Sequence, residues 1–218
     1  MRLFDFNRAP NPLRTRIFIA EKGLSIESIN VSLYRMEQLS PEFLQINPLG
    51  TLPVLETDDG TYIAETLAIC HYLECNHPEP PLFGISAKEQ AQVLMWNNVI
   101  EQHGMASIAE ALRNWSPGFK NRVFPGQMDY AQLPQLIGRG KERTKQFFNI
   151  IENQLKKNHY IAGDNFTFAD ISLLAISEFS TWIEIDPREI HPSISLWYKT
   201  VTSRPSFSSL NYATIAAG

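Results

Sequence analysis

The stretch LPVLETDDGTYIAETLAICHYLECNHPEPP, residues 52–81, carries the signals that decide the fold. Two short apolar segments flank Asp58-Asp59-Gly60, and an Asp-Gly pair tolerates the positive φ of a tight hairpin turn. A helical pattern follows over 65–75. The three prolines at the end of the stretch stop it, because proline can neither continue a helix nor donate to a sheet. The stretch therefore predicts strands at 52–56 and 61–64, a helix and then a domain boundary.

The residues before this stretch predict a strand, a helix and a second strand. Residues 3–6 form a short apolar run, and apolar side chains alternate with polar ones over 28–33. Between them, a helical stripe over 13–20 ends at Gly23, a typical glycine just past a helix end. A β-α-β unit followed by β-β-α implies an α/β domain with a mixed sheet and helices packed on it.

The chain beyond the prolines is helical in pattern. Long helices are predicted over 88–113 and 136–155, and a third helix begins at Thr167, where Asp170 three residues on completes a capping box. The segment 114–134 holds several aromatics among glycines and prolines, which favours an ordered cover. We therefore predict a domain over 1–77, a linker over 78–87 and an all-helical domain over 88–218.

Composition excludes several classes of function. The net charge of -4 over 218 residues argues against nucleic-acid binding, which needs a concentrated excess of Lys and Arg. No apolar stretch is long enough for export or membrane spanning. Cys70 and Cys75 point to different faces of one predicted helix, so no disulfide is expected and a cytoplasmic location fits. The five histidines lack metal-ligand spacing, so no metal is expected.

Six patches, in order along the chain, resemble a known family. They are APNPLRTRIFIAEKGL (9–24), SPEFLQINPLGTLPVL (40–55), AETLAI (64–69), Thr167–Asp170, HPSISLW (191–197) and SRP (203–205). The sequence resembles the cytosolic glutathione S-transferases, of a bacterial type that lacks the usual catalytic Ser, Tyr or Cys. The resemblance implies a thioredoxin-like N-terminal domain packed on a helical-bundle C-terminal domain, usually in a homodimer.

Glutathione, the implied co-substrate, would bind along the first domain. Thr66 lies at a predicted helix N-terminus, where free N–H groups and the helix dipole bind a carboxylate, and Glu65 offers a counter-charge to the ammonium group. The alternative is that both simply start a helix favourably. The resemblance implies a cis Leu52–Pro53 bond, which lets Leu52 pair with the cysteinyl segment. Gln38 falls where many relatives place a His or Lys, although it is equally compatible with an exposed surface residue.

The residue that would activate the glutathione thiol departs from the common pattern. A free thiol has a pKa of about 8.5, so a donor near sulfur is needed to favour the thiolate. The common serine position falls on Ala9, and the resemblance to certain bacterial members implies Asn11 in its place. The alternative is that Asn11 caps the helix that begins at Pro12, and the two roles are compatible. Arg8 and Arg14 are further candidates to help stabilise the thiolate, although exposure to solvent is the favoured expectation for both.

A second substrate is expected between the domains, against side chains of the long helix and the loop after it. An aromatic stripe at helical spacing is also compatible with a core. The leading hypothesis is a transferase for a small hydrophobic electrophile, acting in detoxification. The alternatives are a glutathione-dependent disulfide reductase or peroxidase, and a non-catalytic interaction module. The predicted second-substrate residues are Trp96, Asn97, Ile100, His103, Trp115 and Phe119.

Overall fold

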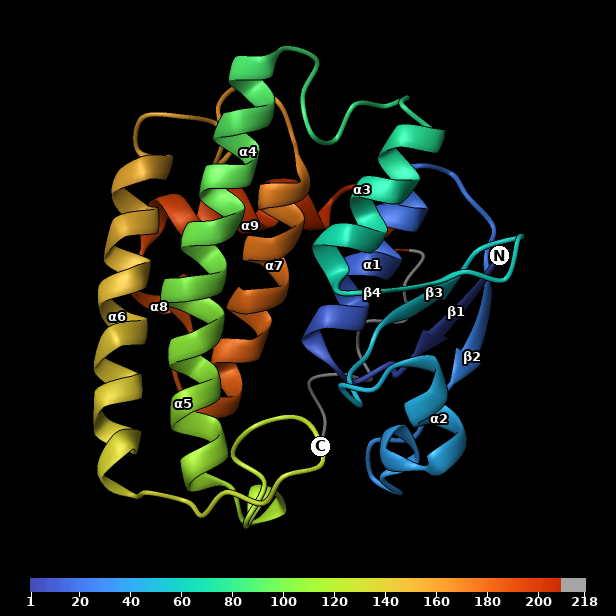
Figure 1. The fold of residues 1–218 in the computed structure, drawn as a ribbon. Coiled ribbons are helices and arrows are strands. Elements are labelled where there is room, and N and C mark those ends of the chain that lie inside the picture. The colour runs from blue at the N-terminus through green and yellow to red at the C-terminus, as the bar shows by residue number, and fades with distance from the viewer. Residues whose placement is uncertain (209–218) are drawn as a thin grey trace.

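The computed structural model describes residues 1–208, which form a sheet domain and a helical domain side by side (Figure 1). The sheet domain holds β1 to β4 with α1 to α3, and the helical domain begins at α4. Among the described residues, no helix is both long and apolar enough to cross a membrane. The expected pairing of an α/β domain with an all-helical one is confirmed.

The sheet is mixed, as predicted, and its strands are short. Its order is β2-β1-β3-β4, with β1 and β2 parallel and the other two pairings antiparallel. β3 begins one residue after Pro53, whose missing N–H cannot contribute to the ladder. The predicted hairpin through Gly60 is confirmed, with φ +82° at that glycine. The strands are β1 (Arg2–Asp5), β2 (Glu27–Asn30), β3 (Val54–Glu56) and β4 (Tyr62–Ala64).

Helices cover both faces of the sheet. α1 (Pro10–Glu21) and α3 (Thr66–Asn76) lie between the sheet and the helical domain (Figure 1). The short α2 (Pro41–Ile46), which the sequence patterns do not predict, places Phe43 in a smaller apolar cluster on the other face. The predicted start of α1 is wrong, because Ala9 is the N-cap and Asn11 lies inside the first turn.

The long helix predicted over 88–113 is divided into three parts. α4 (Ala87–Val99) leads into a π-helical segment, η2 (Ile100–Met105), and then α5 (Ala106–Trp115). A side chain at Gly104 would lie 2.9 Å from Phe147, so this glycine allows close packing of neighbouring helices. The remaining elements are η1 (Glu37–Leu39), η3 (Pro117–Phe119), α6 (Gln135–Leu155), α7 (Phe168–Ser180), η4 (Thr181–Ile183), α8 (Pro187–Ile190), α9 (Pro192–Thr202) and α10 (Pro205–Ser208).

The domains share one apolar core across their boundary. The rings of Phe18 on α1, Phe83 after the prolines and Phe168 on α7 lie within 5.1–6.0 Å of one another. The buried Lys22 ammonium pairs with Glu74 at 2.6 Å and also donates to the segment between the domains. This connecting segment is therefore packed against both domains.

A buried carboxylate organises the predicted capping box, which is confirmed. Asp170 accepts hydrogen bonds from the N–H of Thr167 and the N–H of Ile161, both at 3.0 Å. It also accepts one from Trp197 Nε1 at 2.9 Å, and its exposed fraction is 0%. The box therefore fixes α7, α9 and the loop before α7 together.

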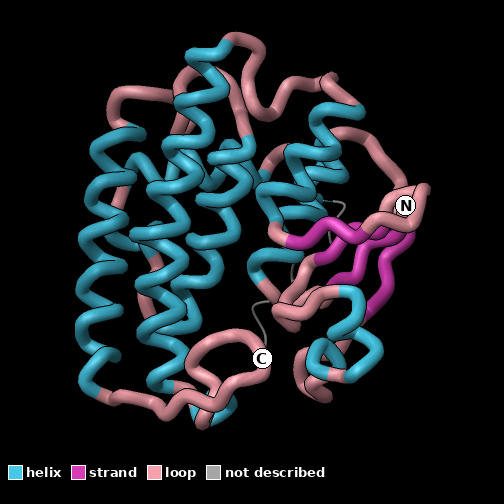
Figure 2. Tube along the Cα trace, viewed as in Figure 1, coloured by secondary structure: helices cyan, strands magenta, loops and turns pink. Residues whose placement is uncertain are grey.

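The loop between α5 and α6 is ordered, but its aromatics do not form the cover expected of them (Figure 2). Phe124 is 62% exposed and packs edge to face on the exposed Tyr130. Gln127 reaches the first domain and donates to the carbonyl of Pro48 at 3.5 Å. The loop thus connects the domains at one end of the bundle.

Candidate functional site

A cleft of about 380 Å³ lies between the two domains. The first domain contributes the N-terminal ends of α1 and α3, and the second contributes one face of α4 and the start of η2. Eight of the ten lining residues are polar or charged, so the cleft offers partners to a charged, peptide-like ligand. The lining residues are Asn11, Arg14, Glu65, Thr66, Leu67, Leu94, Asn97, Asn98, Glu101 and Gln102.

The start of α3 lies on the cleft. Thr66 is the first residue of the helix, so its N–H belongs to the first turn, where amides have no partner within the helix. The Thr66 hydroxyl makes only a long contact of 3.4 Å to the carbonyl of Asn11. Glu65, the N-cap, is exposed and has φ +69°, a conformation uncommon for a residue with a side chain. The turn therefore places a carboxylate beside an anion-binding helix end.

Arg14 lies beneath the cleft, and the expectation that it is solvated is wrong. Its exposed fraction is 1% because α1 presents this side to the helical domain. Its guanidinium donates to Ser172 on α7 and Asn97 on α4, and pairs with Glu101 of η2 at 2.5 Å. Local patterns do not indicate these contacts, because Asn97, Glu101 and Ser172 lie far from Arg14 along the chain.

Asn11 forms the edge of this cluster that faces the cleft. Its Oδ1 accepts a hydrogen bond from Arg14 Nη1 at 3.1 Å. It makes no side-chain capping bond, so the capping alternative is wrong. With the oxygen engaged, the amide NH₂ is the part of the side chain left to donate to a ligand. Arg8, in contrast, is half-buried over the ring of Tyr34.

The predicted peptide-pairing segment lies immediately before β3, an inner strand of the sheet. The Leu52–Pro53 bond is cis, as the resemblance implies, and Leu52 lies outside the β1–β3 ladder. Its N–H and C=O are therefore not used by that pairing. Gln38 lies in η1, and its buried Oε1 has no hydrogen-bond partner among residues 1–208. A side chain at Gly50 would lie 3.1 Å from the carbonyl of Gln38, which brings these two positions together.

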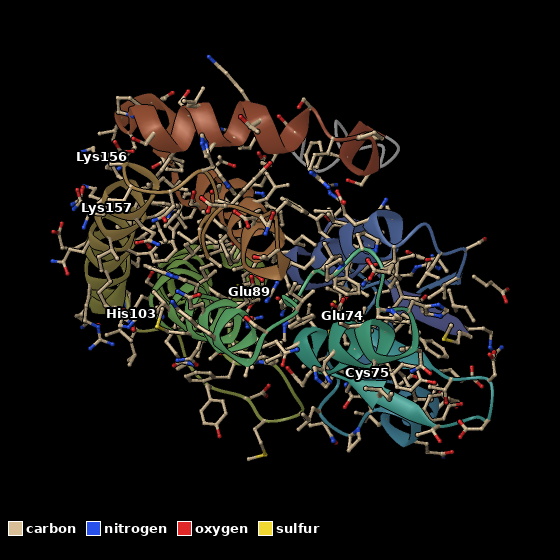
Figure 3. All side chains as sticks on the ribbon, turned by 90° about the horizontal axis from the view of Figure 1, so that it is seen from above. Glu74, Cys75, Glu89, His103, Lys156 and Lys157 are labelled. Atoms are coloured by element: carbon tan, nitrogen blue, oxygen red, sulfur yellow. The ribbon has the colours of Figure 1, made fainter. Side chains whose placement is uncertain are left out.

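Asn11 and Thr66 line the cleft, but most of the predicted second-substrate residues do not. Within the described chain, the cleft lining includes Asn97 but not the other five. Ile100 is 0% exposed in the core, and Trp96 and Phe119 pack partly buried against it. Trp115 is 48% exposed at the end of α5, and His103 lies on the helical domain, apart from Cys75 of α3 (Figure 3). The apolar face of this helix thus packs inward and its polar face lines the cleft.

The described residues supply neither a metal centre nor an activated protein thiol to the cleft. Residues 1–208 contain no group of three His, Cys, Asp or Glu side chains able to hold a metal ion. Cys70 and Cys75 are both unpaired, as expected. Burial raises the pKa of Cys70 to about 12, so its thiol is protonated and unreactive. A thiolate in this cleft would have to come from a ligand.

Two family models and several related sequences match this chain. Residues 9–75 match the model of the glutathione S-transferase N-terminal domain, and residues 124–205 match that of the C-terminal domain. Glutathione S-transferase 2 of Saccharomyces cerevisiae is 31% identical, over 96% of this chain and 89% of that protein. Glutathione S-transferase F10 of Arabidopsis thaliana is 30% identical, over 91% and 90%.

Solved structures agree with the sequence comparisons. The crystal structure of Gtt2 from Saccharomyces cerevisiae has a TM-score of 0.88 at 31% identity, covering 96% of this chain and all of that one (100%). The fold is therefore that of a thioredoxin-like domain followed by a helical domain, shared by a class of transferase enzymes. The chain belongs to the glutathione S-transferase family.

Proposed function

We propose that the chain activates the thiol of glutathione for attack on a small electrophile, with Asn11 as the thiolate contact. The observation that carries the proposal is the joint presence, on one cleft, of the Thr66 helix end and the Asn11 amide. A tripeptide with a carboxylate at one end and a thiol at its centre has complementary groups for both.

The γ-glutamyl end of glutathione fits the start of α3. Its α-carboxylate would accept hydrogen bonds from the Thr66 N–H and hydroxyl, and the helix dipole adds to the attraction. Its α-ammonium would lie toward Glu65, whose carboxylate is exposed on the cleft. The cysteinyl backbone would pair with Leu52 ahead of Pro53 as an added strand does, and Gln38 would contact the glycyl end.

The thiol would then lie at the start of α1. Ala9 offers no hydroxyl, so the amide hydrogens of Asn11 and the positive end of α1 are the groups that favour the thiolate. Each unit of pKa depression requires about 1.4 kcal/mol of preference for the charged form. One hydrogen bond to a charged group supplies about 1.5–3 kcal/mol, which is sufficient.

The setting of the enzyme follows from the same features. A homodimer is the assembly that the family resemblance implies, and Met95 on α4, 50% exposed outside the cleft lining, is compatible with a contact on that helix. Two unpaired cysteines support a reducing cytoplasmic location. Detoxification of small hydrophobic electrophiles is the corresponding physiological role.

The test is titration of glutathione into the protein, followed by ultraviolet absorbance of the bound thiolate across pH. We expect binding at millimolar glutathione or below, and a thiol pKa at least one unit under its free value. Asn11→Ala should raise that pKa again, whereas Asn149→Ala, on the exposed side of α6, should not. An absence of binding would favour a non-catalytic module.

A comparison of substrates then distinguishes conjugation from disulfide reduction. Both use the same activated thiolate, so rates should be measured with an aromatic halide and with a mixed disulfide of glutathione. Faster turnover of the halide supports conjugation, and turnover of the disulfide alone would replace conjugation by reduction.

A further inference from the structure

We infer that Arg14 is a positioning residue for thiol activation, because it fixes the Asn11 carboxamide with its NH₂ toward the cleft. The inference rests on the proposed glutathione site. It assigns to a buried charge at the cleft a role that is exerted through the Asn11 side chain.

The Arg14 guanidinium is held on every side. It has five N–H donors in a rigid plane. Nε and Nη2 both donate to Ser172 Oγ, at 3.1 and 2.8 Å, and Nη2 also donates to Asn97 Oδ1 at 3.0 Å. Nη1 donates to Asn11 Oδ1 at 3.1 Å and pairs with Glu101. All its donors are engaged, so the plane of the group cannot rotate freely.

This arrangement decides which way the Asn11 amide faces. A carboxamide has an acceptor oxygen on one side and two N–H donors on the other. If the amide were reversed, its N–H groups would face Arg14 Nη1, and the N–H that now donates to Asn11 would lose its acceptor, which is unfavourable in this partly buried site. Arg14 therefore holds the oxygen inward and leaves the amide hydrogens for the sulfur.

The positive charge of Arg14 is largely balanced by Glu101. The two groups are 2.5 Å apart, and Glu101 itself lines the cleft. A thiolate in the cleft would experience both charges, which oppose each other at comparable range. The effect of Arg14 on the thiol therefore passes mainly through the orientation of Asn11, and this separates a positioning role from direct charge stabilisation.

Lysine is the informative replacement at this position. Arg14→Lys keeps the charge but replaces the planar group by an ammonium with three donors, which cannot serve Asn11, Asn97 and Ser172 in the same geometry. We expect the bound thiol pKa to rise by about half a unit to one unit, which is roughly a three- to tenfold loss of thiolate at neutral pH. Glutathione affinity should change less, because the Thr66 end is untouched.

The decisive measurement is the double variant. If Arg14 acts through Asn11, Arg14→Lys in an Asn11→Ala background should leave the thiol pKa where Asn11→Ala alone puts it. Arg204→Lys is the matched control, since Arg204 also joins α1 to the helical domain through a bidentate pair, with Glu21 at the opposite end of the helix. It should leave the thiol pKa unchanged.

Two outcomes overturn the inference while leaving the proposed function intact. One is a wild-type-like thiol pKa in folded Arg14→Lys, and the other is a full additional shift on top of Asn11→Ala. If wild type neither binds glutathione nor lowers its thiol pKa, the proposed function fails and the inference with it. Should Arg14→Lys not fold, Ser172→Ala removes one anchor of the guanidinium and should raise the pKa in the same direction; no shift would again overturn the inference.

Discussion

Two buried polar clusters join elements of this protein, one around Asp170 and one around Arg14. Asp170 is enclosed, and its donors are two backbone N–H groups and the side chains of Thr167 and Trp197, all within the helical domain. The Arg14 cluster crosses between the domains and ends at Asn11 on the cleft. The two clusters differ in one respect that bears on the proposed function: the last member of the Arg14 cluster keeps a hydrogen-bonding group on the cleft, whereas Asp170 is closed off from it.

Removing the centre of the enclosed cluster should have the largest effect on stability. Asp170→Ala leaves the Ile161 N–H and Trp197 Nε1–H buried without acceptors and removes a helix cap, so we expect a loss of about 3–5 kcal/mol in urea unfolding. The thiol pKa of glutathione bound to the folded fraction should not change. A changed thiol pKa would mean that the two clusters are coupled.

Removing a predicted contact to glutathione should weaken binding and leave stability almost unchanged. Thr66→Val keeps the shape of the side chain but loses the hydroxyl donor to the glutathione carboxylate. We expect glutathione binding to weaken by about 1.5–3 kcal/mol, roughly 10- to 100-fold in Kd by calorimetry. Unfolding free energy should stay within about 0.5 kcal/mol of wild type. Unaltered affinity would exclude this helix end from the carboxylate site.

The stability of the protein as a function of pH tests the Glu21–Arg204 ion pair, which lies at the opposite end of α1 from the cleft. Burial opposes ionisation, but hydrogen bonds from Arg204 and Ser206 outweigh it and lower the pKa of Glu21. The Glu21 carboxylate therefore binds a proton more readily in the unfolded chain than in the folded one. The stabilisation that ionised Glu21 gives to the fold is present above the unfolded pKa of about 4.3, and it is lost as pH falls through the lower folded pKa.

Glu21→Gln is the matching variant for this series. It should reduce stability by about 1 kcal/mol near neutral pH, and the difference from wild type should shrink at about pH 3. Thermal unfolding of both proteins at the two pH values is the measurement. A difference that grows in acid would reverse the assigned direction of the pKa shift.

The exposed pair on the helical surface should give the smallest effect. Arg139, 59% exposed at its side chain, contacts Glu110 through two hydrogen bonds at 3.0 and 2.7 Å. Solvent screens such pairs, so Arg139→Ala should change unfolding free energy by about 0.5 kcal/mol or less. A loss as large as that of Glu21→Gln would show that burial is not what separates the two arginine pairs.

The two clusters also show how far the sequence alone could reach. Thr167 and Asp170 are three residues apart, so their capping box follows from helix geometry and was predicted. Apart from Asn11 on α1 itself, the partners of Arg14 come from α4, η2 and α7, and the sequence near Arg14 does not indicate them. Only the folded arrangement of the two domains reveals that this arginine is buried.

The sequence alone also does not show which face of α4 lines the cleft. Residues such as Trp96 and Ile100 are predicted substrate contacts only if the long helix turns that face toward the thiol, and a core position is the alternative that the pattern equally allows. In the structure, Ile100 lies in the core and Trp96 packs partly buried against it. The polar side chains of Asn98 and Glu101 line the cleft. Periodicity separates the faces of a helix, but it cannot say which face meets a ligand.

The three phenylalanine rings at the domain boundary have a consequence for folding. Phe83 belongs to the connection, yet its ring stacks on one domain and tilts against the other. Neither half can close its interior without it. The chain should therefore melt as one cooperative unit, and separating it after residue 77 should leave two fragments with exposed apolar surfaces rather than two independent proteins.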